Sequence, residues 1–249
     1  MKKAFMKKQI LGFALFLLMT SIGFAQSDKN LVFDANAQIR KVASFNSVEV
    51  SGSINLYLSQ GTDEALAVSA GDEELISRIK TSVRDNVLYI DFDGKGLNWK
   101  NWSNNKIKAY VTFKTLNRIE ASGASNIKMV DQLKSNDLKI ELSGASDLIG
   151  DISVENLSVT LSGAADCTLK GMAEKSSFNC NGASSVKAFD LKSNYAKIDV
   201  SGATSLRVTV NKEMRAKASG ASSISYKGEA IIRDISSSGA SSIKHRTDE

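Results

Sequence analysis

The sequence has no proline, one histidine and two cysteines in 249 residues, and aromatic side chains make up 7% of it. Because His245 is the lone imidazole, a Ser–His or Cys–His catalytic pair has a single candidate base in the whole chain. Two thiols alone supply neither a disulfide framework nor a zinc site. The composition therefore argues against an enzyme, and we expect no cofactor and no metal site.

Long apolar runs are scarce too, and the one present lies near the N-terminus. Four lysines within residues 2–8 precede the apolar segment 10–19, and Gly23-Phe24-Ala25 provides the small residues of a cleavage site. This segment is short for a membrane span, so residues 1–25 are predicted to be a signal peptide cut before Gln26. We expect export to the periplasm, the outer-membrane surface or the exterior, with no transmembrane segment in the mature chain.

A strong excess of one charge is also missing once the leader is removed. The chain has 32 basic and 27 acidic residues, and four of the basic ones are leader lysines. Their removal lowers the net charge from +5 to +1. A nearly neutral chain has no electrostatic reason to bind nucleic acid, so nucleic acid is not an expected partner.

What the sequence has in abundance is one short motif, Ser-Gly-Ala-Ser and close variants, which occurs seven times after residue 120. The motif glycines are 18 to 21 residues apart, a regularity that a flexible Gly/Ser linker would not keep. These glycines are Gly123, Gly144, Gly163, Gly182, Gly202, Gly220 and Gly239.

Apolar residues recur at fixed offsets from each glycine and alternate with polar ones, as in Lys139-Ile140-Glu141-Leu142. Alternation with a period of two predicts strands with one buried face. One such strand cannot bury its face alone, but stacked copies can. The sequence thus predicts an all-β, single-domain parallel β-helix with coils of about 19–20 residues, right-handed by analogy with other solenoids. The expected inward residues include Ile140, Leu142, Leu148, Val159, Leu161, Val186, Ile198, Val200 and Leu206.

The motif itself is expected to form the corner between two strands of a coil. Glycine accepts backbone angles that other residues avoid, and the alanine that follows each glycine fits a tight corner. A row of ligand-binding hydroxyls is the alternative. The alternation does not decide whether Ser125, Ser146 and Ser184 point inward or outward, because the corner interrupts it.

The N-terminal half is less regular and is expected to form the first coils and close one end of the solenoid. Residues 48–56 match the repeat template once. Strands are expected over 65–68, 87–92 and 107–113. Asp72-Glu73-Glu74 followed by Leu75, Ile76 and Ile79 predicts one short capped helix.

These motifs resemble the autotransporter-adhesin head domain, often called the head GIN domain, of exported bacterial proteins. The resemblance is carried by Gly52-Ser53-Ile54-Asn55 with the following residues to Gly61, by 105–112, and by the Ser-Gly-Ala-Ser run from Ile119. It implies a β-helical envelope or surface protein of the adhesin type and brings no catalytic residues. The expected organisation is a signal peptide (1–25), a lead-in (26–41), a β-helix domain (42–243, with irregular first coils over 42–118 and seven repeats over 119–243) and a polar tail (244–249).

Carboxylates offer one candidate for chemistry. Asp147 and Asp166 occupy the same offset in adjacent repeats and are expected to lie close together. Parallel β-helices that cleave polysaccharides use clustered acidic residues, so a carbohydrate-active enzyme is an alternative function. Three or more carboxylates in one groove would favour it, whereas two aspartates alone fit a solvated edge better.

An asparagine-rich segment contains both tryptophans of the protein. Flat rings beside amide groups suit the faces and hydroxyls of sugars, and the same rings could equally pack over an open end of the solenoid. The candidate ligand-binding residues are Trp99, Trp102, Asn98, Asn101, Asn104 and Asn105.

The leading hypothesis is a non-catalytic exported envelope protein, an adhesin or binding module whose partner is a polysaccharide or another envelope protein. A periplasmic scaffold that binds a protein through a solenoid face is a further alternative. Cys167 and Cys180 fall at inward offsets beside the same corner, so they are either two buried thiols or a disulfide. The sequence does not fix the oligomeric state.

Overall fold

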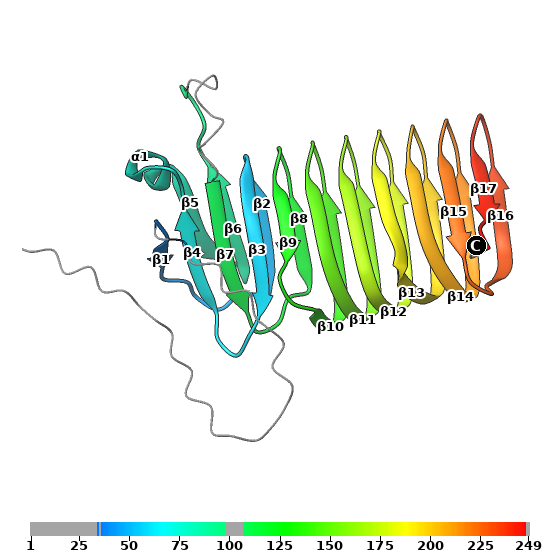
Figure 1. The fold of residues 1–249 in the computed structure, drawn as a ribbon, viewed down its shortest axis with the longest axis horizontal. Coiled ribbons are helices and arrows are strands. Elements are labelled where there is room, and N and C mark those ends of the chain that lie inside the picture. The colour runs from blue at the N-terminus through cyan, green and yellow to red at the C-terminus, as the bar shows by residue number, and fades with distance from the viewer. Residues whose placement is uncertain (1–33, 35, 98–106, 248–249) are drawn as a thin grey trace, which may run out of the picture. The chain divides into compact units, whose positions relative to one another are not determined.

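The computed structural model describes residues 34, 36–97 and 107–247. These residues form one helix and 17 strands, which pair into one continuous hydrogen-bonded system (Figure 1). The helix is α1 (Glu73–Ser77). The strands are β1 (Gln38–Arg40), β2 (Ser47–Ser51), β3 (Ile54–Gln60), β4 (Ala65–Ser69), β5 (Ile79–Arg84), β6 (Val87–Phe92), β7 (Ile107–Phe113), β8 (Arg118–Ala121), β9 (Asn126–Met129), β10 (Leu133–Leu142), β11 (Asp147–Leu161), β12 (Asp166–Cys180), β13 (Ser185–Val200), β14 (Ser205–Ala218), β15 (Ser223–Lys227), β16 (Ile231–Ser237) and β17 (Ser242–His245).

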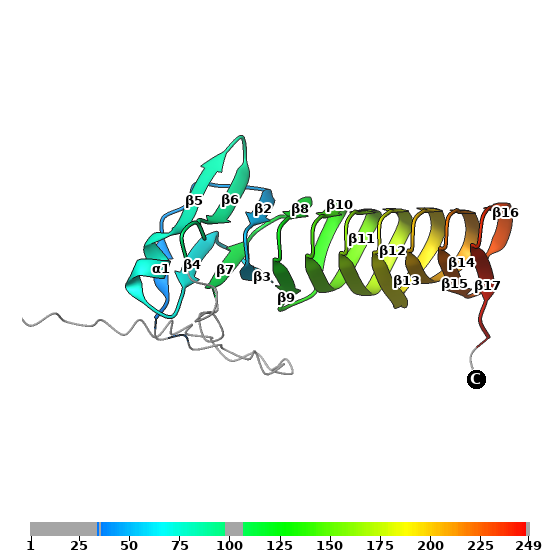
Figure 2. The same cartoon turned by 90° about the horizontal axis from the view of Figure 1, so that it is seen from above.

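From β8 onward the chain winds as stacked parallel coils, which confirms the predicted solenoid. Leu142 of β10 pairs with Leu161 of β11, which pairs with Cys180 of β12, and the same register continues to Val200 and Ala218. Each step advances by about one repeat of the sequence. Figure 2 shows the two sides of each coil facing each other across the interior. The hand of the solenoid stays a prediction.

The interior is filled by the alternating apolar residues. All nine residues predicted to point inward are buried, with exposed fractions of 2% or less. In-register stacking places each of them on an equivalent apolar residue of the next coil, as with Ile140 on Val159 and Val159 on Phe178. A single core therefore runs along the coils, and no coil buries its apolar face alone.

The corner glycines are required by two constraints at once. Each motif glycine has a positive φ, and a Cβ added to Gly144 would lie 2.5 Å from the carbonyl oxygen of Gly123. The corners approach this closely because Ala145 N donates a 2.7 Å hydrogen bond to that same oxygen. The corner is therefore a site of direct contact between the backbones of successive coils, as well as a turn.

The residue two positions after the corner glycine points inward at the corners from Gly123 to Gly220, which answers the question that the sequence left open. Ser125, Ser146 and Ser184 are buried, as is Thr204. Ser125 Oγ and Thr204 Oγ1 each donate to the carbonyl oxygen three residues earlier in their own corner, at 3.0 and 2.7 Å. The hydroxyls of Ser125 and Thr204 thus stabilise their corners, and the burial of all four residues keeps them from any ligand outside.

The N-terminal strands close the amino-terminal end of the stack. The turn at Gly52 joins β2 and β3 into a coil, and β6 and β7 lie parallel to β2 and β3 on the outer side. The antiparallel strands β5 and β4 then follow β6 and β7, and β1 pairs with β4. Strands β4, β6 and β7 match the three predicted ones.

The predicted helix forms, but it is shorter than its apolar residues suggested. Asp72 caps α1 by accepting a hydrogen bond from Leu75 N, and Leu75 and Ile76 are buried. Ile79, expected in the helix, instead begins β5. The two-residue turn Asp85-Asn86, with positive φ at both positions, joins β5 to β6 and holds Ile79 opposite Phe92.

Cys167 and Cys180 are free thiols in the structure, which therefore has the two buried thiols rather than the disulfide. Both are buried, with Cys167 stacked on Val186 and Cys180 stacked on Leu161. Burial raises the pKa of the Cys167 thiol well above its usual range and that of Cys180 to about 12. Both thiols therefore pack as small apolar groups.

We expect Leu161→Asp to lower the free energy of unfolding by about 4 kcal/mol, because it places a carboxyl group without a partner in the core. The matched control is Ile149→Asp, since Ile149 belongs to the same strand, β11, but its side chain is on the outer face and 57% exposed. Thermal unfolding followed by circular dichroism measures both. Equal melting of Leu161→Asp and the unsubstituted chain would contradict the register.

The corner contact predicts that Gly163→Ala costs about 3 kcal/mol of stability, from the positive φ and from the approach of Cβ to the Gly144 carbonyl oxygen at 2.6 Å. Gly96→Ala is the control, because Gly96 also has a positive φ but its added Cβ would meet no described atom within 4 Å. It should cost about 1 kcal/mol. Urea unfolding measures the loss of unfolding free energy in both variants. Equal losses would exclude a contribution from the contact between corners.

Alkylation provides the test of the cysteine state. We expect two labelled thiols per chain after denaturation without reductant, and no labelling of the folded protein, because both thiols are buried and protonated. Mass spectrometry counts the labels. Labelling that appears only after reduction would establish the disulfide instead.

Candidate functional site

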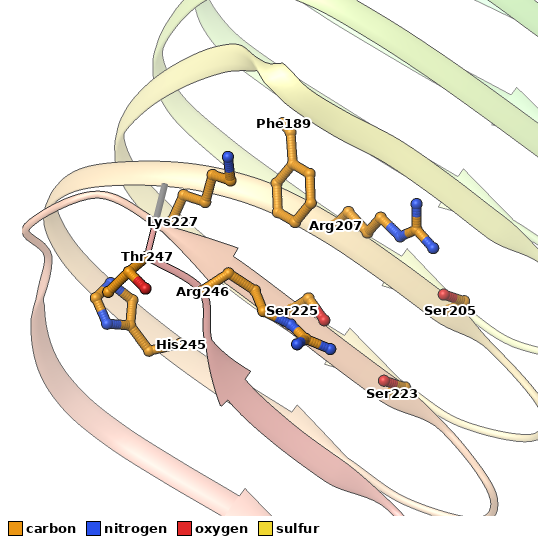
Figure 3. A pocket seen from close by; sticks show the side chains of 9 residues that line it. All are labelled: Phe189, Ser205, Arg207, Ser223, Ser225, Lys227, His245, Arg246 and Thr247. Atoms are coloured by element: carbon orange, nitrogen blue, oxygen red, sulfur yellow. The ribbon is translucent and has the colours of Figure 1, made fainter. Parts of the chain in front are cut away.

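A basic pocket lies on the outer face of the last coils, where β13, β14, β15 and β17 are neighbours (Figure 3). Its volume is about 580 Å³. The residues that line it are Phe189, Ser205, Arg207, Ser223, Ser225, Lys227, His245, Arg246 and Thr247. The pocket therefore combines side chains from four successive turns of the solenoid.

Three cations of the pocket come from three consecutive coils. Arg207 belongs to β14, Lys227 ends β15, and Arg246 follows β17. Arg207 points outward because its neighbours Leu206 and Val208 are buried in the core. Since stacked strands are about 4.8 Å apart, the coils place these cations at successive levels of one face.

Phe189 gives the pocket an apolar wall. The register between β13 and β14 shifts between Ala188 and Lys192; of the extra residues, Leu191 is buried in the core, whereas Phe189 is only partly buried and Asp190 is exposed. Thr209 Oγ1 donates a 2.7 Å hydrogen bond to the Phe189 carbonyl oxygen and so holds the bulge. Lys227 Nζ lies 5.3 Å from the centre of the Phe189 ring, at the range of a cation–π contact.

His245 lies at the end of the pocket and belongs to a strand. Residues 244–249 are predicted from the sequence to form a polar tail, but β17 continues through His245 by pairing with β15. The His245 ring is 4.9 Å from that of Tyr226, and its Nε2 lies 3.1 Å from the Gly228 carbonyl oxygen. Register pairing explains the difference, because the backbone of β15 offers hydrogen bonds to the residues after the last corner.

The chemistry of this pocket suits a ligand with several negative charges. None of the described lining residues is Asp or Glu, so the side chains that form the pocket wall carry positive charge and no carboxylate. The hydroxyl groups of Ser205, Ser223 and Ser225 lie on the same face and can donate hydrogen bonds to carboxylate or sulfate oxygens. Arginine adds paired donors whose geometry matches such groups.

These cations are not among the candidate site residues predicted from the sequence. Arg207 lies five residues after its corner glycine, and Lys227 and Arg246 each lie seven residues after theirs. Comparing the outward offsets from coil to coil would have found the row, because basic residues gather at them in the last repeats. The bulge at Phe189 has no such signal, since it depends on a register shift between two coils.

Asp147 and Asp166 are brought together as predicted. They are register partners on β11 and β12. Partial burial and the neighbouring Asp166 carboxylate raise the pKa of Asp147, while Lys187 acts against this. Among the residues that the structure describes, no three His, Cys, Asp or Glu side chains group as a metal site would require.

The tryptophan segment was the other sequence-predicted site. Trp99, Trp102, Asn98, Asn101, Asn104 and Asn105 all lie outside the described residues. Their role in binding or in capping stays a prediction.

Within the described ranges, the helix is neither long enough nor apolar enough to cross a membrane.

Solved structures share this fold. A protein from Bacteroides fragilis NCTC 9343, named "a putative adhesin", superposes with a TM-score of 0.78 at 25% sequence identity, over 84% of this chain and 96% of that one. A "putative adhesin" from Parabacteroides distasonis ATCC 8503 has a TM-score of 0.67 at 20% identity, over 84% and 96%. A "putative lipid binding protein" from the same strain has a TM-score of 0.61 at 20% identity, over 86% and 98%. The last two likenesses show the fold alone.

A comparison with curated protein sequences gives no match. The family model described as "Putative auto-transporter adhesin, head GIN domain" matches residues 44–230, well over half of the chain. The matched segment includes the first coil at Gly52 and the corners from Gly123 to Gly220. Stacked coils, glycine corners and this match agree with one another, and the chain belongs to the head GIN domain family of adhesin-type proteins.

Proposed function

We propose that this protein is an exported, non-catalytic binding module of the cell envelope, and that its basic pocket binds anionic polysaccharide. The observation that carries the proposal is a set of three cations on consecutive coils in a pocket wall without a carboxylate, with Lys227 and Arg246 at the same offset from their corners and Arg207 at an offset two residues shorter. A polysaccharide with regularly repeated carboxylate or sulfate groups presents charges in a row as well. The match between two repeating structures favours a polymer over a single small anion.

Export is supported by the N-terminal residues. The lysines within residues 2–8, the apolar segment 10–19 and Gly23-Phe24-Ala25 have the order and length of a secretory signal. Membership of an adhesin-type family agrees with this. The compartment that we propose is the periplasm, the outer-membrane surface or the exterior.

The pocket should hold a polysaccharide weakly per site. Exposed ion pairs are each worth about 0–1 kcal/mol, since water and salt screen them. Phe189 can add contact with the apolar face of a sugar ring, as aromatic residues do in such sites. Useful adhesion then depends on many sites acting together on one polymer.

The competing functions lack a comparable site. A polysaccharide-cleaving enzyme on this scaffold would need clustered carboxylates, and the pair Asp147 and Asp166 has no third carboxylate grouped with it in the described part of the chain. The tryptophan segment remains a second proposed contact for sugars. It would favour neutral rings, because its candidate residues are aromatic and amide groups.

The test is retention of the purified secreted chain on immobilised alginate, a polyuronate, and on heparin, a sulfated glycan, with dextran as the neutral control. We expect the triple variant Arg207→Gln/Lys227→Gln/Arg246→Gln to bind at least about tenfold more weakly, because three ion pairs of about 0.5–1 kcal/mol are lost. Raising the salt concentration should weaken the unsubstituted chain in the same direction.

The matched control is Lys128→Gln/Lys175→Gln/Lys197→Gln, which removes the same charge from exposed lysines on other parts of the coils. It should bind as the unsubstituted chain does. Equal losses of binding in both triple variants would show that net charge, rather than the pocket, determines retention. Loss of binding only in Trp99→Ala/Trp102→Ala would show that the tryptophan segment is the binding site. No retention of the unsubstituted chain would reject the proposal.

A further inference from the structure

The carboxyl-terminal end of the solenoid has an open edge. Strand β16 pairs with β14 and strand β17 pairs with β15, and within the described residues neither strand has a partner on its other side (Figure 1, red end). The outer backbone N–H and C=O groups of these strands are therefore available for pairing. An edge of this kind is a template for another strand.

The core is uncovered at the same place. Ile232 and Ile235 stack on Met214 and Ala216, which are buried, so they belong to the inward row of the solenoid. Yet Ile232 is 37% exposed and Ile235 is 44% exposed, because no further coil covers them. The open edge thus combines unpaired backbone with the apolar interior of the last coil.

The opposite end is built differently. There β5 and β1 complete the two sides as antiparallel strands, and Leu75, Ile76 and Ile79 bury the apolar groups of that end. The two ends are therefore not alike, and the carboxyl-terminal edge does not find a continuation of its coil at the amino-terminal end. This favours contact between two carboxyl-terminal ends over head-to-tail stacking.

We propose that two copies of this chain join through β16, antiparallel about a two-fold axis that passes between Arg233 and Asp234. The register between β14 and β16 shifts by one residue at Arg233, so Ile232 and Ile235 both face inward although they are three positions apart. In the proposed register Ile232 lies opposite the partner's Ile235, so inward residues meet inward residues. Arg233 lies opposite the partner's Asp234, so opposite charges meet on the outer face. Both pairs occur twice by symmetry, and directly opposed pairs of these kinds stabilise antiparallel strands.

Arg233 and Asp234 already have partners of opposite charge on the outer face of their own chain, and these partners are compatible with the proposed pairing. Asp234 is in register with Arg215 on the outer face, and Arg233 Nε donates to Glu213 Oε2 at 3.0 Å. A guanidinium group has further N–H donors, so Arg233 can pair with a second carboxylate without losing Glu213. The edge therefore presents one cation and one anion side by side, which is the pattern that a two-fold axis makes self-complementary.

Joining in this way would also place the two basic pockets on one face. A two-fold axis normal to the sheet of β16 continues that sheet into the β16 sheet of the partner. The opposite sheets, which contain β15 and β17, then lie on the same face of the dimer. A polysaccharide could then contact both pockets at once and gain from bivalence. This consequence rests on the proposed function, whereas the pairing of the two chains does not.

Sedimentation velocity of the purified secreted chain over a range of concentrations tests the pairing. We expect a reversible dimer and no larger species. Asp234→Arg and Arg233→Asp should each weaken dimerisation at least tenfold, because each places like charges opposite each other. An equimolar mixture of the two variants should form the dimer again, since every pair across the axis is then of opposite sign.

Two controls keep folding and binding apart from association. Asp199→Arg makes the same charge change on the same outer face, away from the edge, and should dimerise like the unsubstituted chain. Melting by circular dichroism at a concentration where the unsubstituted chain is also monomeric should be the same for the variants, and alginate retention of the pocket variant is measured separately. A monomer at every concentration, growth into fibres, or a mixture that stays monomeric would each overturn the proposal.

Discussion

The structure depends on contact between the backbones of successive glycine corners. The amide of the alanine after one corner glycine donates to the carbonyl oxygen of the previous corner glycine, at 2.7–2.8 Å from coil to coil. A Cβ on either glycine would separate the corners. Because this contact fixes where every coil begins, it sets the register of the strands on both sides, and with it which residues point inward.

Once the register is fixed, the inward row and the outward row serve different purposes. The inward residues form one core, including the two thiols and the corner hydroxyls, and they are closed to ligands. The outward row can vary from coil to coil without disturbing that core. On the side of β11 to β17 it carries Asp147 and Asp166 in adjacent coils, and Arg207 and Arg246 in later ones.

The two ends of the stack differ for the same reason. At the amino-terminal end, antiparallel strands and α1 replace the repeat and cover the core. At the carboxyl-terminal end, no other strand of the described residues covers the last coil, and Ile232 and Ile235 are partly exposed. The basic pocket lies beside this open end, so the proposed ligand site and the proposed contact between copies share the last coils.

Much of the fold could be predicted from the sequence, because period-two alternation and a repeat near 19 residues allow few arrangements other than a β-helix. The same alternation identified Leu161 and its equivalents as core. The site could not be predicted in this way. Phe189 reaches the pocket through a bulge, and His245 is held by a strand that exists only because β15 lies beside it.

The sequence by itself thus determined the coil, its corners and its inward row, since these depend on residues close together in the chain. The orientation of Ser125 and the meeting of Arg207, Lys227 and Arg246 were decided only by the tertiary structure. So was the exposure of Ile235 at the open edge. The physical reason is that contacts between coils join residues about 19 positions apart, and one residue of register shift changes which side chains meet.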